Sequence, residues 1–190
     1  MFKAVLRLVA PLAVALLVGC PSAPHFNRSG FPAEISGVGD SQNFPLQVAG
    51  YQRGKMYMYQ PGMKDYSIGY DRFEATLQNA VTLYFYPLVR PIAEQFNAEK
   101  QEILGAHAGS VLLVERQTSV QKNGVSFQAF IATFKFDEIF AGQQQKVFSE
   151  LVLVALPDRF FKVRSSAPLA QASPAEASMF GLLERINWAY

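Results

Sequence analysis

Residues 111–136 read VLLVERQTSVQKNGVSFQAFIATFKF, and they predict two long strands joined by a tight turn. Asn123-Gly124 is a typical two-residue hairpin turn, because a type I′ turn needs positive φ at both central positions. The second strand, residues 125–136, carries apolar residues on both parities, which predicts a central strand covered on both faces. This hairpin pairs its two strands antiparallel, and we expect the other strands of the chain to extend it into one antiparallel sheet.

Five further segments have strand character. Three precede the hairpin, at residues 51–59, 66–71 and 80–86, and two follow it, at residues 146–156 and 159–164. Residues 80–86, AVTLYFY, alternate most clearly between the two faces. Consecutive strands with few helices between them form antiparallel sheets, so six or seven strands are predicted in one sheet.

Two helices complete the predicted body. The first covers residues 91–106, where apolar residues recur at helical spacing after a proline that suits the first turn. The second follows residues 173–176, SPAE, which have the pattern of a capping box with proline at the first helical position. Its stripe of Met179, Leu183 and Ile186 is expected to lie on the sheet. The predicted fold class is α+β, with one mid-chain and one C-terminal helix packed on the antiparallel sheet.

The order of these elements resembles that of the photosystem-extrinsic PsbP proteins and of the Mog-type Ran-binding proteins. The resemblance concerns element order alone, because no diagnostic motif matches residue by residue. It therefore implies a fold and assigns no functional residue.

The first twenty residues, MFKAVLRLVAPLAVALLVGC, have the composition of a secretory signal peptide. Lys3 and Arg7 lead into an apolar run over residues 8–18, which is shorter than the roughly 20 residues of a spanning helix. The run ends in Leu17-Val18-Gly19-Cys20, which resembles the lipobox of bacterial lipoproteins. That resemblance implies that the Cys20 thiolate receives a diacylglyceryl group, that residues 1–19 are removed, and that the new amino group is acylated.

Lipidation of Cys20 predicts a membrane anchor, because each buried CH₂ of an acyl chain contributes about 0.8 kcal/mol. Pro21 stands where an aspartate retains enterobacterial lipoproteins at the inner membrane, so we expect the outer membrane and a domain facing the periplasm. The body also resembles small lipoproteins of Gram-negative bacteria, which implies the same address. Residues 20–43 are predicted to be a flexible tether and residues 44–190 a single α+β domain.

Composition excludes several function classes. Cys20 is the only cysteine, so its lipidation leaves the domain without disulfides, thiol chemistry or cysteine metal ligands. His25 and His107 lie far apart in the sequence, and neither a metal nor another cofactor is expected. The chain has 17 basic and 15 acidic residues, and loss of Lys3 and Arg7 leaves 15 of each. A formally neutral body lacks the basic footprint of a nucleic-acid-binding protein.

A surface of rings and cations is the candidate ligand-binding site. It consists of alternate residues of two strands, namely Tyr51, Arg53, Lys55, Tyr57 and Tyr59 in the first and Phe160, Lys162 and Arg164 in the second. If the two faces adjoin, they suit sugars by stacking and phosphates or carboxylates by charge. The alternative interpretation is ordinary strand aromatics with cations that protect exposed edges.

No catalytic residue is assigned. His107 is predicted to cap or pack at the end of the first helix, since no Gly-x-Ser-x-Gly elbow accompanies it. Glu115 and Glu150 lie in strands and form either a carboxylate pair across the sheet or ion pairs with basic neighbours such as Arg116.

The leading expectation is a lipid-anchored binding or envelope-assembly module whose partner is an envelope protein or an anionic glycan. One alternative is an envelope hydrolase that uses carboxylates or His107. Another is a carrier of an apolar ligand held between sheet and helices. A hydrolase needs a cleft beside a perturbed titratable group, a carrier needs an unfilled apolar cavity, and a binding module needs an exposed patch.

Overall fold

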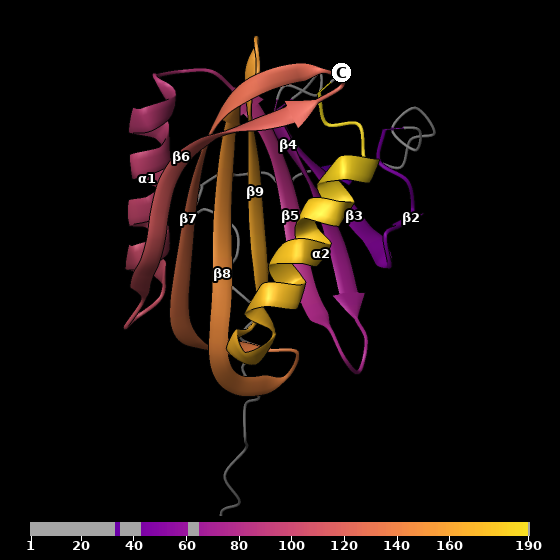
Figure 1. Ribbon diagram of the computed structural model, residues 1–190, viewed down its shortest axis with the longest axis vertical. Coiled ribbons are helices and arrows are strands. Elements are labelled where there is room, and N and C mark those ends of the chain that lie inside the picture. The colour runs from indigo at the N-terminus through magenta and orange to yellow at the C-terminus, as the bar shows by residue number, and fades with distance from the viewer. Residues whose placement is uncertain (1–32, 35–42, 61–64, 190) are drawn as a thin grey trace, which may run out of the picture.

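The computed structural model describes residues 33–34, 43–60 and 65–189 (Figure 1). Their strands form one antiparallel sheet in the order β1-β3-β4-β5-β9-β8-β7-β6, with β2 also paired to β3. Two strands, β1 (Ala33–Glu34) and β2 (Gln47–Val48), are only two residues long. The long strands are β3 (Tyr51–Gln60), β4 (Asp65–Phe73), β5 (Gln78–Pro87), β6 (Val111–Lys122), β7 (Val125–Phe140), β8 (Gln143–Ala155) and β9 (Arg159–Pro168). The predicted α+β class is confirmed.

The two helices, α1 (Ile92–Ala106) and α2 (Ala172–Arg185), cover opposite faces of the sheet. Phe96 of α1 packs in one core with Leu151 of β8, whereas Met179 of α2 packs in another core with Val152. Successive residues of a strand point to opposite faces, so the two cores lie on opposite sides of β8. We call these sides the α1 face and the α2 face. In Figure 1 α2 crosses the α2 face diagonally, toward the viewer.

The predicted stripe on α2 packs on the sheet, because Met179, Leu183 and Ile186 are all buried. The predicted capping box is wrong. The short 3₁₀ helix η2 (Leu169–Gln171) already turns the chain, so α2 begins at Ala172 and no side chain caps it. Ser173 and Pro174 instead lie within the first helical turn, where a missing proline N–H costs no hydrogen bond.

The hairpin of β6 and β7 forms as predicted, with φ of 52° at Asn123 and 77° at Gly124. β7 carries apolar side chains on both faces as predicted, and it is an interior strand paired with β6 and β8. It lies beside the edge strand β6, and β5 and β9 occupy the middle of the sheet. Its double cover comes from α1 on one face and from the core beneath α2 on the other.

The tip of this hairpin is bound to the end of α2. The ammonium group of Lys122 donates to the carbonyl oxygens of Leu183, at 3.2 Å, and Glu184, at 2.7 Å. A cation bonded to the last carbonyls of a helix is favourable because those groups have no partner within the helix. The bond holds β6 above the sheet beside α2, and Figure 1 shows this end of the hairpin curling over the α2 face.

The signal peptide, Cys20 and most of the predicted tether lie outside the described residues. Neither α1 nor α2 combines the length and apolar character of a membrane-spanning helix, and no other described helix does so.

Candidate functional site

The predicted surface of rings and cations is divided between the two faces of the sheet. Tyr51 is buried on the α2 face, where its hydroxyl accepts a hydrogen bond from the Asn79 side chain at 2.8 Å. Arg53, opposite Tyr70, lies on the same face and donates to the carbonyl oxygen of Phe44. Tyr57, opposite Ser67, lies on the α1 face, and Tyr59 bonds the Ser67 hydroxyl at 2.9 Å.

Two irregularities in β3 cause this division. The pairing register with β4 shifts between Arg53 and Met56 and again between Met58 and Gln60. Each shift breaks the strict alternation from which a single face was predicted. Lys55 falls within the first irregular stretch and is exposed.

Lys162 and Arg164 share the α1 face as predicted, but their charged groups bind neighbouring side chains beneath the surface. Lys162 is 6% exposed, and its ammonium group lies 2.7 Å from the Glu99 carboxylate of α1 and 4.4 Å from the centre of the Tyr84 ring. Glu99 also accepts hydrogen bonds from Tyr86 and Gln95. Arg164 donates to the Ser149 hydroxyl at 3.0 Å, and burial lowers its pKa. The two predicted strand faces therefore do not form one exposed surface.

The two candidate carboxylates also lie on opposite faces. Glu115 of β6 is 2.7 Å from Lys100 of α1, whereas Glu150 of β8 has the parity of Val152 on the α2 face. They do not form a pair across the sheet, and neither binds Arg116. His107 caps α1, stacks on the Phe136 ring at 3.9 Å and places Nδ1 3.1 Å from Glu138. Its predicted capping and packing role is confirmed.

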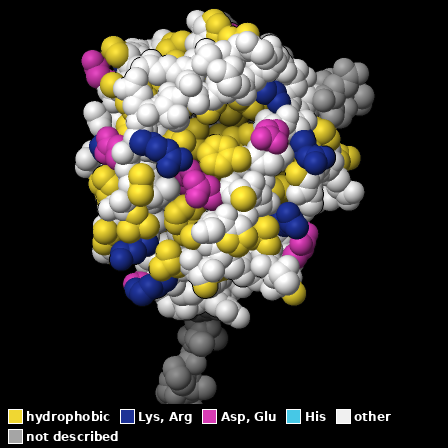
Figure 2. Space-filling view, in the orientation of Figure 1, with side chains coloured by type: hydrophobic (Ala, Val, Ile, Leu, Met, Phe, Trp, Pro, Cys, Tyr) yellow, Lys and Arg dark blue, Asp and Glu magenta, His cyan; other side chains and the backbone are white. Residues whose placement is uncertain are grey.

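An apolar groove opens on the α2 face between β6 and α2. Its volume is about 260 Å³. Its lining residues are mostly apolar and come from β6, β8, β9 and the C-terminal segment: Val120, Gln121, Val152, Val154, Phe161, Phe180, Leu183, Glu184 and Trp188. Figure 2 shows a hollow with a hydrophobic floor on this face, bordered by acidic and basic side chains. The groove is slightly smaller than a typical small-molecule pocket, so it fits one chain or ring.

Trp188 closes one end of the groove. Its indole stacks on Phe161 at 4.9 Å between ring centres, and its N–H donates to the Leu183 carbonyl oxygen at 3.0 Å. With its polar atom bonded to the backbone, the ring offers the groove only an apolar surface.

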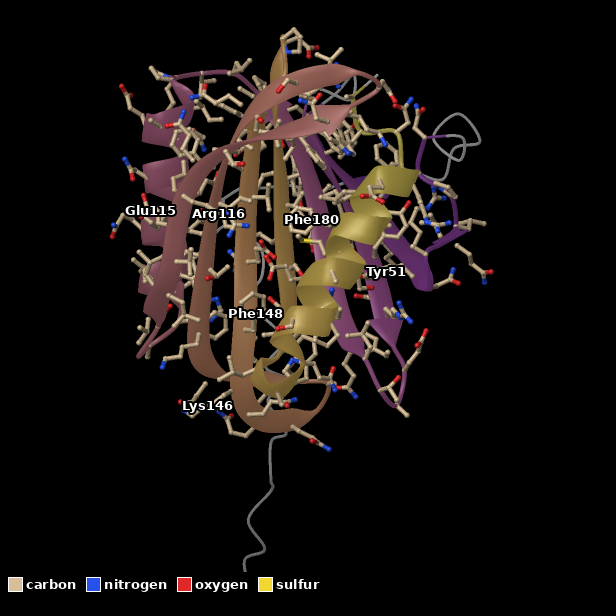
Figure 3. The ribbon with its side chains drawn as sticks, in the orientation of Figure 1. Tyr51, Glu115, Arg116, Lys146, Phe148 and Phe180 are labelled. Carbon is tan, nitrogen blue, oxygen red and sulfur yellow. The ribbon has the colours of Figure 1, made fainter. Side chains whose placement is uncertain are left out.

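The buried carboxyl of Glu150 lies beyond the other end of the groove floor. Val154, Val152, Glu150 and Phe148 follow one another on the α2 face of β8, about 7 Å apart. Figure 3 shows Phe148 on this face. Glu150 is 0% exposed, and neither of its carboxyl oxygens has a hydrogen-bond partner among the described residues. A buried polar group without a partner costs about 1–3 kcal/mol, so this one needs an explanation.

Two polar residues near Glu150, Ser165 and Asn79, bond one another and not the carboxyl. Ser165, its neighbour on β9, donates to the side-chain oxygen of Asn79 at 2.8 Å. The Asn79 amide in turn donates to Tyr51 and to the Ala175 carbonyl oxygen of α2. Thr133, its neighbour on β7, completes the row. The polar band beneath α2 is thus satisfied at Asn79 and Ser165 but not at Glu150.

A weak ion pair spans the groove near Glu150. Arg116 of β6 reaches Glu176 of α2 at 3.8 Å, and these side chains are 48% and 38% exposed. Figure 3 shows Arg116 on the β6 side of this face and Phe180 on the α2 side. Burial raises the pKa of Glu150 to about 8, the charge of Glu176 adds to the rise, and Arg116 opposes it. The carboxyl is therefore largely protonated at neutral pH.

This arrangement suits binding more than hydrolysis. It provides an apolar channel with one protonated carboxyl buried next to its floor, and the carboxylate that acts on Glu150, that of Glu176, is partly exposed and paired with Arg116. The described residues contain no group of three or more histidine, cysteine or acidic side chains able to hold a metal ion.

The sequence carries one signal for this site. In the strand pattern of residues 146–156, an acidic residue stands at 150 between apolar residues of the same parity. This pattern predicts a buried carboxyl at residue 150. It does not predict the groove, because the groove depends on how β6 and α2 are placed in space. Comparison of the chain with protein-family models gives no match, and comparison with curated proteins gives no significant one.

Proposed function

We propose that this chain is a lipid-anchored envelope protein that binds the apolar part of a ligand in the groove between β6 and α2. Acyl chains on Cys20 hold it to the outer membrane, and the domain faces the periplasm. This function combines the expected binding module with the expected carrier of an apolar ligand. The groove is the observation that carries it.

The walls of the groove support a binding role because they come from separate elements joined at one end. Lys122 fixes β6 to the last turn of α2, whereas at Arg116 and Glu176 an exposed ion pair joins them. Exposed pairs of this kind contribute about 0–1 kcal/mol, so the two walls separate easily there. A ligand therefore gains access without disruption of the sheet.

The predicted anchor fits such a ligand. Since β1 (Ala33–Glu34) pairs with β3, the proposed tether between Cys20 and the sheet comprises residues 21–32, and a flexible chain of that length has a root-mean-square reach of roughly 20 Å, which keeps the domain close to the membrane surface. Apolar molecules that leave a membrane are captured most readily by a protein held at that distance. The anchor and the groove together favour a ligand that comes from the membrane.

Trp188 gives a direct test, because it is the only tryptophan in the chain and it lines the groove. The full chain with Cys20→Ala, free of attached lipid, is titrated with N-phenyl-1-naphthylamine, an apolar fluorophore. We expect saturable energy transfer from Trp188 to the bound fluorophore.

Val120→Phe adds bulk to the groove from its β6 wall and should weaken this binding about tenfold, which corresponds to about 1.4 kcal/mol. Val89→Phe is the matched control, because Val89 is exposed in a loop and does not line the groove. Absence of energy transfer, or equal weakening by both substitutions, contradicts the proposed function.

A further inference from the structure

Glu150 is the described side chain with the most prominent unmet hydrogen-bonding capacity. Both of its carboxyl oxygens lack partners, whereas Ser110 and Arg164 each leave only one buried atom without one. The neighbouring Ser165 and Asn79 bond one another, so the missing partner is not a general defect of this region. The carboxyl also lies in line with the apolar floor of the groove.

We propose that Glu150 binds the polar head of an amphiphile, and that this head is an uncharged hydrogen-bond acceptor such as an ester or amide carbonyl. The apolar chain of the same molecule lies along Val152 and Val154 toward Trp188. This inference rests on the proposed function and adds the chemical class of the ligand, a neutral acyl ester or amide.

The charges around Glu150 favour this class of head group. The titratable groups that face it are Glu176 from α2 and Arg116 from β6, while β7 and β9 contribute Thr133 and Ser165. With Glu150 protonated, Arg116 and Glu176 compensate each other and the site has no net charge. A protonated carboxyl has one O–H to donate, and an ester or amide carbonyl accepts it.

Charged heads fit less well. An anionic head meets the carboxylate of Glu176, and the cation that faces Glu150, Arg116, is already shared with that group. A cationic head forces Glu150 to ionise, and both charges then lose their hydration in an apolar site. An uncharged head avoids both costs.

The ion pair of Arg116 and Glu176 is the entrance to Glu150. It is long and nearly half exposed, and it spans the gap between β6 and α2 close to the buried carboxyl. Opening this pair admits a head group and requires no change in the sheet. The chain of the ligand then occupies the groove that is already open.

The test uses three probes of equal chain length that carry bromine at the far end: methyl 12-bromododecanoate, 12-bromododecanoate and 12-bromododecylamine. Bromine quenches Trp188 when the head lies at Glu150 and the chain fills the groove. At pH 7 we expect the ester to bind at least about tenfold more tightly than the amine or the carboxylate. Tighter binding of either charged probe overturns the inference.

Two variants separate the donor from the groove. Glu150→Leu removes the donor and should weaken ester binding about tenfold while leaving N-phenyl-1-naphthylamine binding unchanged. Glu150→Gln keeps a neutral donor, so ester binding should stay within about threefold of the original. Ester binding to the unchanged protein should fall above pH 8, and binding to Glu150→Gln should not.

The failure of this inference differs from the failure of the proposed function. If N-phenyl-1-naphthylamine and the bromine probes all fail to report binding at Trp188, the groove itself is not a binding site. If they bind but Glu150→Leu leaves ester affinity unchanged, the groove stands and the role of Glu150 is overturned. Circular dichroism of each variant confirms that the fold is retained.

Discussion

Lys162 and Glu150 are ionisable residues buried on neighbouring strands of one sheet, yet their surroundings differ completely. Lys162, on the α1 face, contacts the Glu99 carboxylate at 2.7 Å and the Tyr84 ring, and Glu99 accepts two further hydrogen bonds. Glu150, on the α2 face, has no hydrogen-bond partner among the described residues and lies next to the floor of an open groove. Burial alone therefore does not mark a functional residue here. A candidate functional residue is marked by a buried polar group that lacks a hydrogen-bond partner and lies next to accessible apolar space.

The largest expected effect is on the paired side. Lys162→Ala leaves the Glu99 carboxylate buried without its cation, so we expect a loss of about 3–5 kcal/mol in the free energy of unfolding. Urea denaturation measures it. Lys146→Ala is the matched control, because the ion pair of Lys146 with Asp137 is exposed and should be worth less than about 1 kcal/mol. Equal effects of the two substitutions would remove the contrast between the faces.

The unpaired side should respond with the opposite sign. Glu150→Leu replaces a polar group that has no partner with an apolar side chain of similar size, so we expect a gain of about 1–3 kcal/mol in stability at neutral pH. Urea denaturation of this variant at pH 7 is the check. A loss of stability would mean that the carboxyl of Glu150 is bonded in the folded protein.

The pH dependence of stability sharpens the same comparison. The folded-state pKa of Glu150, about 8, lies above the ordinary value of 4.5, so the folded protein holds a proton that the unfolded chain releases. This contribution is fully present below pH 4.5 and is lost as pH rises toward 8, at no more than about 1.4 kcal/mol per pH unit. Glu150→Gln should flatten this part of the stability profile. An unchanged profile would show that Glu150 does not titrate as described.

The smallest effect is expected at the entrance. Arg116→Ala breaks the exposed pair with Glu176 and should change stability by less than about 1 kcal/mol. It should nevertheless raise the association rate of the ester probe in stopped-flow measurements of Trp188 quenching, because the walls of the groove are no longer joined there. A slower association would show that Arg116 guides the ligand and does not restrict its entry.

Local patterns predicted much of the fold. Asn123-Gly124 indicated the hairpin, the alternation of residues 80–86 indicated β5, and the stripe of Met179 and Leu183 indicated which side of α2 packs on the sheet. These signals depend on residues close together in the chain. They are reliable because a turn dipeptide sets the local backbone geometry, and because apolar periodicity within one element sets which of its sides is buried.

The site was less accessible to prediction. Strict alternation from Tyr51 to Tyr59 requires an unbroken strand, and the register shift of β3 between Arg53 and Met56 places Tyr57 on the other face. The groove forms where β6 and α2 lie side by side. Strands β7, β8 and β9 separate these two elements in the sequence, so no local pattern predicts that they meet. Glu150 was recognised as a strand carboxylate, but its lack of a partner follows only from the side chains that surround it in space.

The infrared spectrum of the Glu150 carboxyl at pH 7, obtained as the difference between the unchanged protein and Glu150→Gln, shows directly whether this carboxyl is protonated and whether it donates to the ligand. We expect the carbonyl band of a protonated carboxyl, and this band should shift to lower frequency when methyl 12-bromododecanoate is added, because the ester carbonyl accepts a hydrogen bond from the carboxyl O–H. A carboxylate band at pH 7, or a protonated band that the ester leaves unmoved, would contradict it.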